Sequence, residues 1–240
     1  RRGVLRRDCQ RMVNQDRNVF AACMVANGDA DGLVTGLTRS FNASFRQVMQ
    51  VLGPKPDQRV MAVSMIVTGR RTIFIADTNV HELPTAEQMA DIAQQTAAKV
   101  RAWGHEPRVA LVSYSNFGNP ERPTNAAVRG AVSILDRRDV DFEYDGEMSV
   151  DVALDMELQA DSYPFCRLTG PANILVMPGL HSANISYKLL QRVGGGPLIG
   201  PILLGVRKPV QIVQMGTTVS HIIEAAALAA YDAIDSGAAD

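Results

Sequence analysis

Short apolar runs rich in β-branched residues alternate with longer segments of helical periodicity along most of this chain. Residues 108–113 and 210–213 are examples of the short runs, and residues 85–103 form one of the helical segments. Strands that alternate with helices are typical of an α/β protein with a mainly parallel sheet. Ligands of such proteins collect beyond the carboxyl ends of the strands. The pattern therefore directs attention to the loops that follow Val34, Val112, Val176 and Val213.

The same patterns predict the positions of the individual elements. The predicted strands are 32–35, 60–66, 72–76, 108–113, 141–145, 172–177, 199–203 and 210–213. The predicted helices are 19–25, 44–51, 85–103, a segment ending near 137, 149–159, 184–192 and 220–234. Gly69-Arg70-Arg71 separates the second and third strands and predicts a hairpin. Thr85 is expected to cap the helix that follows it, with Gln88 completing a capping box.

Composition excludes several classes of function. The chain has 240 residues, with 24 Lys and Arg against 25 Asp and Glu, and this balance argues against a nucleic-acid-binding protein. No apolar run reaches the roughly 18 residues of a membrane helix. Cys9, Cys23 and Cys166 are odd in number and far apart, and the four histidines share no metal-binding spacing. We therefore expect a soluble, cytoplasmic protein with no metal site.

A cluster of arginines marks the start of the chain. It consists of Arg1, Arg2, Arg6, Arg7 and Arg11. No apolar segment of the kind found in secretory signals follows it. We interpret the cluster as the solvated face of a helix, or as a helix that more chain preceded.

The residues alone do not identify a reaction. Gly194, Gly195 and Gly196 follow a predicted helix, which indicates a helix end rather than a nucleotide-binding loop. The chain has no GxSxG motif. Asp145 and Glu147 are a candidate acid/base pair, although neighbouring carboxylates at a strand end are more often caps and turn acceptors.

Segments at these loops resemble the phosphate acetyltransferase/butyryltransferase family over nearly the whole chain. The resembling segments are 31–36, 76–77, 84–93, 106–115, 145–147, 172–176, 184–188, 200–202 and 208–210. The resemblance begins partway into the family's first domain. It implies two α/β domains with mainly parallel sheets around a cleft, the second inserted into the first. Domain I would comprise residues 1–55 and 204–240, and domain II residues 56–203.

One departure from the family's pattern concerns catalysis. The enzymes carry Asn-Asp-Leu-Ser-Arg-Gly near the carboxyl end, where the Ser and Arg hold the acyl phosphate, and an Asp five residues further on acts as base. This chain reads Gln211-Ile-Val-Gln-Met-Gly216 there, with His221 at the position of the base. A thioether cannot replace the bidentate grip of a guanidinium on phosphate. We therefore expect no catalytic residues, because Gln214, Met215 and His221 are degenerate positions.

The acyl-CoA side of the predicted cleft is closer to the family's pattern. Ser40 and Arg46 match family residues, whereas Phe41 replaces a Thr and His81 replaces an Asn. The resemblance implies an acetyl-CoA site drawn from both domains. Its expected residues are Arg39, Ser40, Arg46, Ser64, His81, Ser113, Ser115, Asn184, Tyr187, Lys188, Met215, Gly216 and Thr217.

Further segments resemble the C-terminal acetyltransferase-like domains of large bacterial NADP-dependent malic enzymes. These segments are 17–21, 141–148, 163–167, 210–213 and 225–231. The resemblance implies a non-catalytic module that binds acetyl-CoA, or a related acyl-CoA, and restrains the conversion of malate to pyruvate by a catalytic domain in the same polypeptide. NADP and a divalent metal, Mg or Mn, would belong to that catalytic domain, and no cofactor is expected in this segment.

The family's usual state implies a homodimer through domain II, with a higher oligomer in the full-length enzyme. Residues 122–138 and 199–203 are candidate interface material, although 199–203 can equally be a core strand. No nucleic acid or membrane partner is expected. Two alternatives remain: a phosphate acetyltransferase that makes acetyl phosphate from acetyl-CoA and phosphate, and a purely structural oligomerisation domain. The first needs an anion clamp from elsewhere, such as Arg39 or Arg207.

Overall fold

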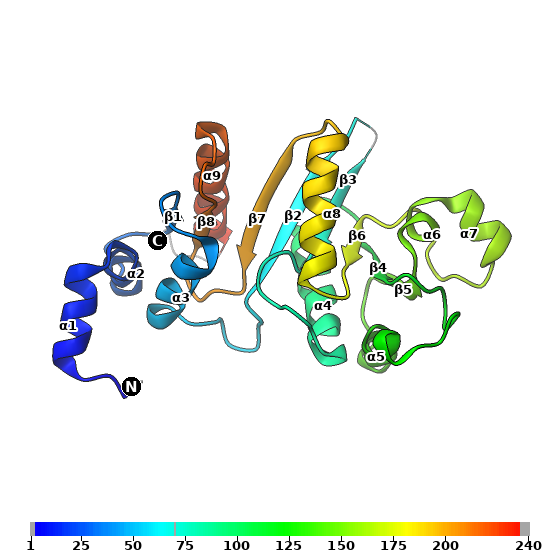
Figure 1. Ribbon diagram of the computed structural model, residues 1–240, viewed down its shortest axis with the longest axis horizontal. Helices are drawn as coiled ribbons and strands as arrows, with labels where there is room; N and C mark the ends of the chain where they lie inside the picture. The colour runs from blue at the N-terminus through cyan, green and yellow to red at the C-terminus, as the bar shows by residue number, and fades with distance from the viewer. Residues whose placement is uncertain (1–2, 70, 236–240) are drawn as a thin grey trace. The chain divides into compact units, whose positions relative to one another are not determined.

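The computed structural model describes residues 3–69 and 71–235, which form two compact units (Figure 1). Unit 1 comprises Arg1–Val60 and Gly200–Asp240, and unit 2 comprises Met61–Ile199. Unit 2 is therefore inserted between the two segments of unit 1. The predicted domain boundaries, at 55/56 and 203/204, lie within a few residues of these limits. The arginine cluster and the hairpin turn predicted above include Arg1, Arg2 and Arg70, which lie outside the described residues.

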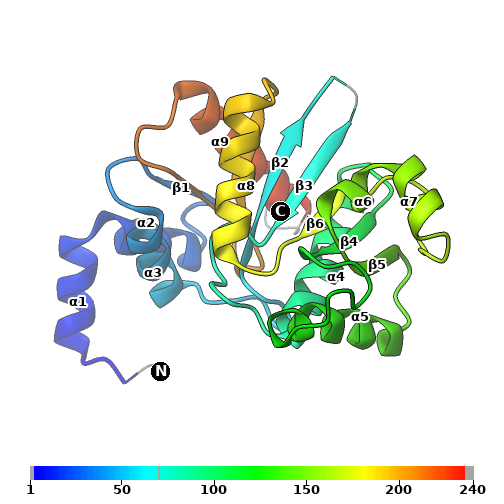
Figure 2. The same cartoon turned by 45° about the vertical axis from the view of Figure 1, so that its right-hand side comes forward.

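Unit 1 is built around a pair of parallel strands. β1 (Leu33–Gly36) pairs with β8 (Val210–Val213), so that Leu33 lies opposite Val210. The helices of this unit are α1 (Arg6–Gln15), α2 (Arg17–Asn27), α3 (Phe41–Val51) and α9 (Val219–Asp235). In Figures 1 and 2, α2 and α3 lie side by side and α9 runs next to β1 and β8. α1 contains no buried residue, which agrees with a solvated arginine face.

Unit 2 supplies most of a six-stranded sheet. The strands are β2 (Met61–Val67), β3 (Thr72–Ala76), β4 (Arg108–Val112), β5 (Glu143–Met148), β6 (Ile174–Val176) and β7 (Leu198–Leu204), in the order β5-β4-β6-β3-β2-β7. The pairs β4–β5, β4–β6 and β3–β6 are parallel. β2 and β3 form the predicted antiparallel hairpin. The predicted α/β fold with a mainly parallel sheet is confirmed.

The helices of unit 2 cover this sheet. They are α4 (Ala86–Ala102), α5 (Ala126–Arg138), α6 (Val150–Leu154), α7 (Met156–Ser162) and α8 (Leu180–Val193), and the short 3-10 helix η1 (Pro123–Asn125) precedes α5. Side chains of the central strands, such as Phe74, Ile75 and Leu111, are fully buried. α8 runs alongside β2 and β3, and α6 and α7 lie at the β4–β5 end of the unit (Figures 1 and 2). Parallel strands of this kind read as continuous apolar runs because both faces are buried.

Local capping chemistry explains where several helices begin. Thr85 caps α4 and forms the predicted capping box with Gln88. α3 begins at Phe41 rather than 44 because Ser40 accepts a hydrogen bond from the backbone N–H of Ala43. α8 also begins before the predicted position, at Leu180 rather than 184, but there the N-cap residue is Gly179 and no side chain caps the helix. Side-chain oxygens that accept these otherwise unpaired N–H groups stabilise the first turn.

Two predicted elements were wrong in detail. The helix predicted over 149–159 is two helices, because Asp155 has an extended backbone and caps α7 by accepting from the N–H groups of Glu157 and Leu158. The strand predicted to end at Asp145 continues to Met148. Glu147 therefore lies in a buried strand and not in a turn.

Candidate functional site

In unit 1 the carboxyl ends of β1 and β8 lie next to each other. Gly36 is opposite Val213, and the backbone N–H of Leu37 donates to the carbonyl of Val213 at 3.4 Å. The loops 37–40 and 214–218 therefore leave the same edge, and each leads into the N-terminus of a helix, α3 or α9. Helix N-termini favour anions because their N–H groups are unpaired and the helix dipole is positive there. This edge is the candidate ligand-binding face of unit 1.

The backbone of the first loop is unusual. Gly36 has φ +116, and a Cβ at this position would collide with the carbonyl oxygen of Val213. Leu37 follows with φ +64 and a side chain that is 44% exposed. A non-glycine residue in this region costs roughly 1–2 kcal/mol, and such strain is concentrated at functional sites. The loop conformation is therefore held by its surroundings rather than by the preference of Leu37.

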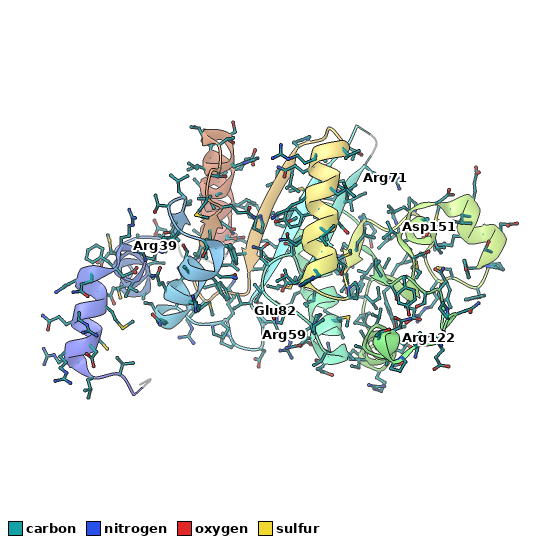
Figure 3. The ribbon with its side chains drawn as sticks, in the orientation of Figure 1. Arg39, Arg59, Arg71, Glu82, Arg122 and Asp151 are labelled. Atoms are coloured by element: carbon teal, nitrogen blue, oxygen red, sulfur yellow. The ribbon has the colours of Figure 1, made fainter. Side chains whose placement is uncertain are left out.

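A polar network supports this loop. Asp16 caps α2 by accepting from the N–H groups of Asn18 and Val19, and Nη1 of Arg39 lies 2.5 Å from its Oδ2 (Figure 3 labels Arg39 beside α2 and α3). Burial acts to raise the pKa of Asp16, but the hydrogen bonds from Arg39 and from Val19 and Asn18 outweigh it and hold this pKa below its ordinary value. Gln47 also donates to Asp16. The charge of Arg39 is thus engaged inside unit 1.

The second loop carries the degenerate positions. The side chain of Met215 is 61% exposed, so a thioether stands on the surface where the resemblance implies a phosphate-binding arginine. The N–H of Thr217 donates to the carbonyl of Gln214 at 3.3 Å, which closes the turn through Gly216. The backbone N–H of His221 donates to Thr218 Oγ1 at 3.4 Å. Arg46 is exposed on α3.

Gln211, which the sequence placed only among the departures, has a structural role in unit 1. It is 2% exposed, and its side-chain Oε1 accepts from the N–H of Leu203 at 2.9 Å. Its Nε2 donates to the carbonyl of the same residue at 3.2 Å. The amide thus pairs with the backbone of β7 as another peptide group would. A glutamine within an apolar strand was the one signal of this role in the sequence.

In unit 2 the corresponding edge carries an aspartate and a histidine. Asp77 directly follows β3, and its carboxylate accepts from backbone N–H groups. The Nδ1 atom of His81 lies 2.6 Å from Oδ2 of the same carboxylate. The sequence singled out His81, but Asp77 only as part of a family-like segment. The spacing of four residues was the available signal.

A second buried network lies at the ends of β4 and β5. Ser115 Oγ donates to Glu147 Oε1 at 2.6 Å, Asn125 Nδ2 donates to Ser115 Oγ at 2.7 Å, and Ser113 Oγ lies 3.1 Å from the same oxygen. Arg129 Nη1 lies 3.3 Å from Glu147 Oε1 and neutralises its charge. Glu147 and Ser115 are fully buried. Asp145, its predicted partner, instead accepts from the backbone N–H and the guanidinium of Arg167.

Of the other predicted binding residues of unit 2, some are buried and some are exposed. Ser64 is buried and donates to Thr78 Oγ1 at 3.1 Å. Tyr187 is 2% exposed and belongs to the hydrophobic core, and Asn184 Nδ2 donates to its hydroxyl at 3.4 Å. Lys188 is exposed, with Nζ 6.0 Å from the centre of the Tyr187 ring. Acetyl-CoA contacts at these residues stay predictions.

Within the described part of the chain, no group of three or more His, Cys, Asp and Glu residues is placed to hold a metal ion. No helix of residues 3–69 and 71–235 combines the length and the apolar character needed to cross a membrane.

The comparisons with known proteins agree on the family. The family described as phosphate acetyl/butaryl transferase matches residues 1–230. The NADP-dependent malic enzyme of Rhizobium meliloti is 53% identical over 233 residues, which cover 97% of this chain and 30% of that protein. The phosphate acetyltransferase of Treponema pallidum is 37% identical over 220 residues, which cover 87% of this chain and 66% of that protein.

A solved structure extends this agreement to the fold. The crystal structure of a phosphotransacetylase from Streptococcus pyogenes superimposes with a TM-score of 0.89 and 33% identity, over 95% of this chain and 70% of that one. The chain spans about a third of the length of the malic enzymes that it matches. Because sequence and structure agree over nearly all of its residues, the chain belongs to the phosphate acetyl/butaryl transferase family.

Proposed function

We propose that this chain is a non-catalytic module that binds acetyl-CoA and regulates a malic enzyme activity of the polypeptide that contains it. The observation that carries the proposal is the exposed thioether of Met215 at the β1–β8 edge, where the family's pattern has an arginine. The similarity of nearly the whole chain to one third of several malic enzymes supports the second half of the proposal.

Loss of catalysis follows from the charges available at the β1–β8 edge. Preorganised donors that stabilise charge in the transition state are worth about 10²- to 10³-fold in rate each. Arg39, a conceivable substitute for the missing arginine, is committed to Asp16 at 2.5 Å. Gln214 and Met215 supply no positive charge. None of these three residues therefore replaces the family's anion clamp for acyl-phosphate chemistry.

Binding of acetyl-CoA needs fewer precisely placed charged groups than acyl-phosphate catalysis does. The N-termini of α3 and α9 each follow a loop that leaves this edge, and Arg46 is exposed on the first of these helices. Coenzyme A carries phosphate groups that such positive ends attract. Arg46, Gly216 and Thr217 are therefore the residues of unit 1 that we expect to contact acetyl-CoA.

Titration of the 240-residue chain with acetyl-CoA tests the binding half. We expect saturable binding, and ligand at 100 times its Kd should add about 2.7 kcal/mol to the free energy of unfolding. Arg46→Glu should weaken binding, with the largest effect at low salt. Arg6→Glu, which reverses an exposed charge on α1, is the matched control and should leave affinity unchanged. An unmodified chain that acetyl-CoA neither binds nor stabilises contradicts the proposal.

A working phosphate acetyltransferase is the second candidate, favoured by the similarity to the Treponema pallidum enzyme and by His221 at the start of α9. We expect no acetyl phosphate from acetyl-CoA and phosphate above the background rate. The double change Gln214→Ser with Met215→Arg should restore part of the activity because it rebuilds the anion clamp. Turnover by the unmodified chain that disappears in His221→Ala would instead establish the enzyme.

The regulatory half concerns the complete polypeptide. Its catalytic domain would use NADP and a divalent metal, and acetyl-CoA would restrain malate oxidation because it lies downstream of the pyruvate formed. A ligand can do this only if it binds two arrangements of the protein with different affinity. Malate oxidation measured with and without acetyl-CoA, in the unmodified polypeptide and in Arg46→Glu, tests this coupling.

A homodimer through unit 2 is also part of the proposal. Sedimentation of the 240-residue chain tests it, and a monomer at micromolar concentration would contradict it.

A further inference from the structure

The buried carboxylate of Asp77 accepts hydrogen bonds from four backbone N–H groups. Its side chain is 2% exposed, and Oδ1 accepts from the backbone N–H groups of Ala62, Asn79 and Val80 at 3.0, 3.0 and 3.2 Å. Oδ2 accepts from the N–H of His81 at 2.9 Å. All four partners are obligatory donors, so the carboxylate acts as the acceptor throughout. Three of these donors belong to the loop that follows β3, so the loop is held by this one carboxylate.

The same carboxylate orients the imidazole of His81. Nδ1 of His81 lies 2.6 Å from Oδ2 of Asp77. An ionised carboxylate can only accept hydrogen bonds, so beside it Nδ1 carries the proton and the lone pair of the neutral ring is on Nε2. Nε2 forms no hydrogen bond with any described residue, and it is not among the buried unpartnered atoms. The 15% of the side chain that is exposed therefore includes a fixed acceptor nitrogen.

The position of this pair in unit 2 is that of a ligand-contacting group. β3 and β6 are parallel neighbours, and the Asp77–His81 loop follows the carboxyl end of β3. Ligands of such sheets bind at this edge. The loop is also anchored, because the N–H of Leu180 donates to the carbonyl of Glu82 at 3.0 Å (Figure 3 labels Glu82 near the start of α8). The loop that carries the imidazole is therefore fixed both by Asp77 and by the start of α8.

His221 offers a contrast among the histidines. It occupies the position of the family's base, yet no described carboxylate lies within ion-pairing distance of its ring. A histidine held by a carboxylate has a defined tautomer and orientation, and an unpaired one has neither. Of these two histidines, His81 is the one that a carboxylate orients.

We infer that His81 holds the ligand of unit 2 by accepting a hydrogen bond at Nε2, and that Asp77 is the residue that positions it. The ligand group must carry a proton on nitrogen or oxygen. In acetyl-CoA, the ligand proposed above, the amide N–H groups of the pantetheine arm have this chemistry. The identity of the ligand rests on the proposed function, whereas the tautomer of His81 does not.

Nitrogen-15 NMR of the histidine side chains tests the orientation without any ligand. Neutral His81 should carry its proton on Nδ1. In Asp77→Asn the side chain can present an N–H group to the ring, and the proton should move to Nε2. A signal of the unmodified chain that places the proton of His81 on Nε2 overturns the inference.

Binding of acetyl-CoA tests the contact itself. At a pH where the NMR signals show a neutral ring, His81→Phe should lower affinity about tenfold, the value of one hydrogen bond to a buried or half-buried partner. His105→Phe is the matched control, because His105 precedes β4 and lies at the opposite edge of the sheet. If His81→Phe does not fold, the His81 signals of the unmodified chain are followed during the titration and should shift.

The outcomes separate the two proposals. Acetyl-CoA that binds the unmodified chain and His81→Phe equally, or that leaves the His81 signals unmoved, overturns this inference and leaves the proposed function standing. Acetyl-CoA that fails to bind the unmodified chain at all overturns the proposed function, and with it the ligand named here.

Discussion

Single side chains explain why Arg39 does not take the place of the missing arginine at the β1–β8 edge. Met215 presents a thioether to solvent, and the nearby cation of Arg39 already neutralises Asp16. Separating that pair would leave a half-buried carboxylate without its cation, which costs more than an exposed ion pair is worth. Asp16 therefore serves the fold, through the start of α2 and the support of the loop before α3.

The depressed pKa of Asp16 predicts how its contribution depends on pH. A carboxyl whose pKa is lower in the folded state adds stability above its unfolded pKa of about 3.9, and this stability is lost as the pH falls through the folded value. Asp16→Asn should therefore lower the free energy of unfolding at neutral pH, and the difference from the unmodified chain should shrink below about pH 4. Urea denaturation across this range measures it. A difference that stays constant with pH contradicts the assignment.

Short-range capping sets where several helices of this protein begin. Asp16, Ser40, Thr85 and Asp155 each accept a hydrogen bond from a backbone N–H in the first turn of the helix that follows. The cap at Asp155 even divides a continuous helical pattern into α6 and α7. Such caps are local, so a strong one outweighs the periodicity of the residues around it.

Removal of the α4 cap should have a measurable cost. Thr85→Ala removes the acceptor of the Gln88 N–H, a contact of 3.2 Å, and weakens the return bond from the Thr85 N–H to Gln88 Oε1 at 2.8 Å. We expect a loss of about 1 kcal/mol in the free energy of unfolding. Ser220→Ala, an exposed serine in the first turn of α9, is the control and should change stability little. Equal effects of the two changes would contradict the role of the capping box.

The molecule as a whole depends on contacts between segments that are far apart in sequence. Unit 1 is made of two segments separated by all of unit 2, and β1 and β8 come from different ones. The side chain of Gln211 adds a connection from β8 to the backbone of β7. Its amide group forms hydrogen bonds with the N–H and the carbonyl of Leu203, as the backbone of a neighbouring strand would.

Gln211→Leu tests this connection. The apolar side chain has a similar size but leaves the N–H and the carbonyl of Leu203 without the partners that Gln211 supplied. Buried polar groups left unpaired cost roughly 1–3 kcal/mol each, so this variant should unfold at clearly lower denaturant concentration. Gln50→Leu, at an exposed position of α3, provides the comparison and should be nearly neutral. A Gln211→Leu variant as stable as the unmodified chain would show that the two bonds contribute nothing.

Local features of the sequence were sufficient for the fold class, the β2–β3 hairpin, the cap at Thr85 and the change at Gln214 and Met215. Each depends on residues within a few positions of one another, where periodicity, turn chemistry and side-chain identity act directly. The charge partner of Arg39, the burial of Ser64 and Tyr187, the Ser115–Glu147 bond and the bridge made by Gln211 could not be read in this way. These join residues from different strands and helices, so they exist only once the sheet order has brought those elements together.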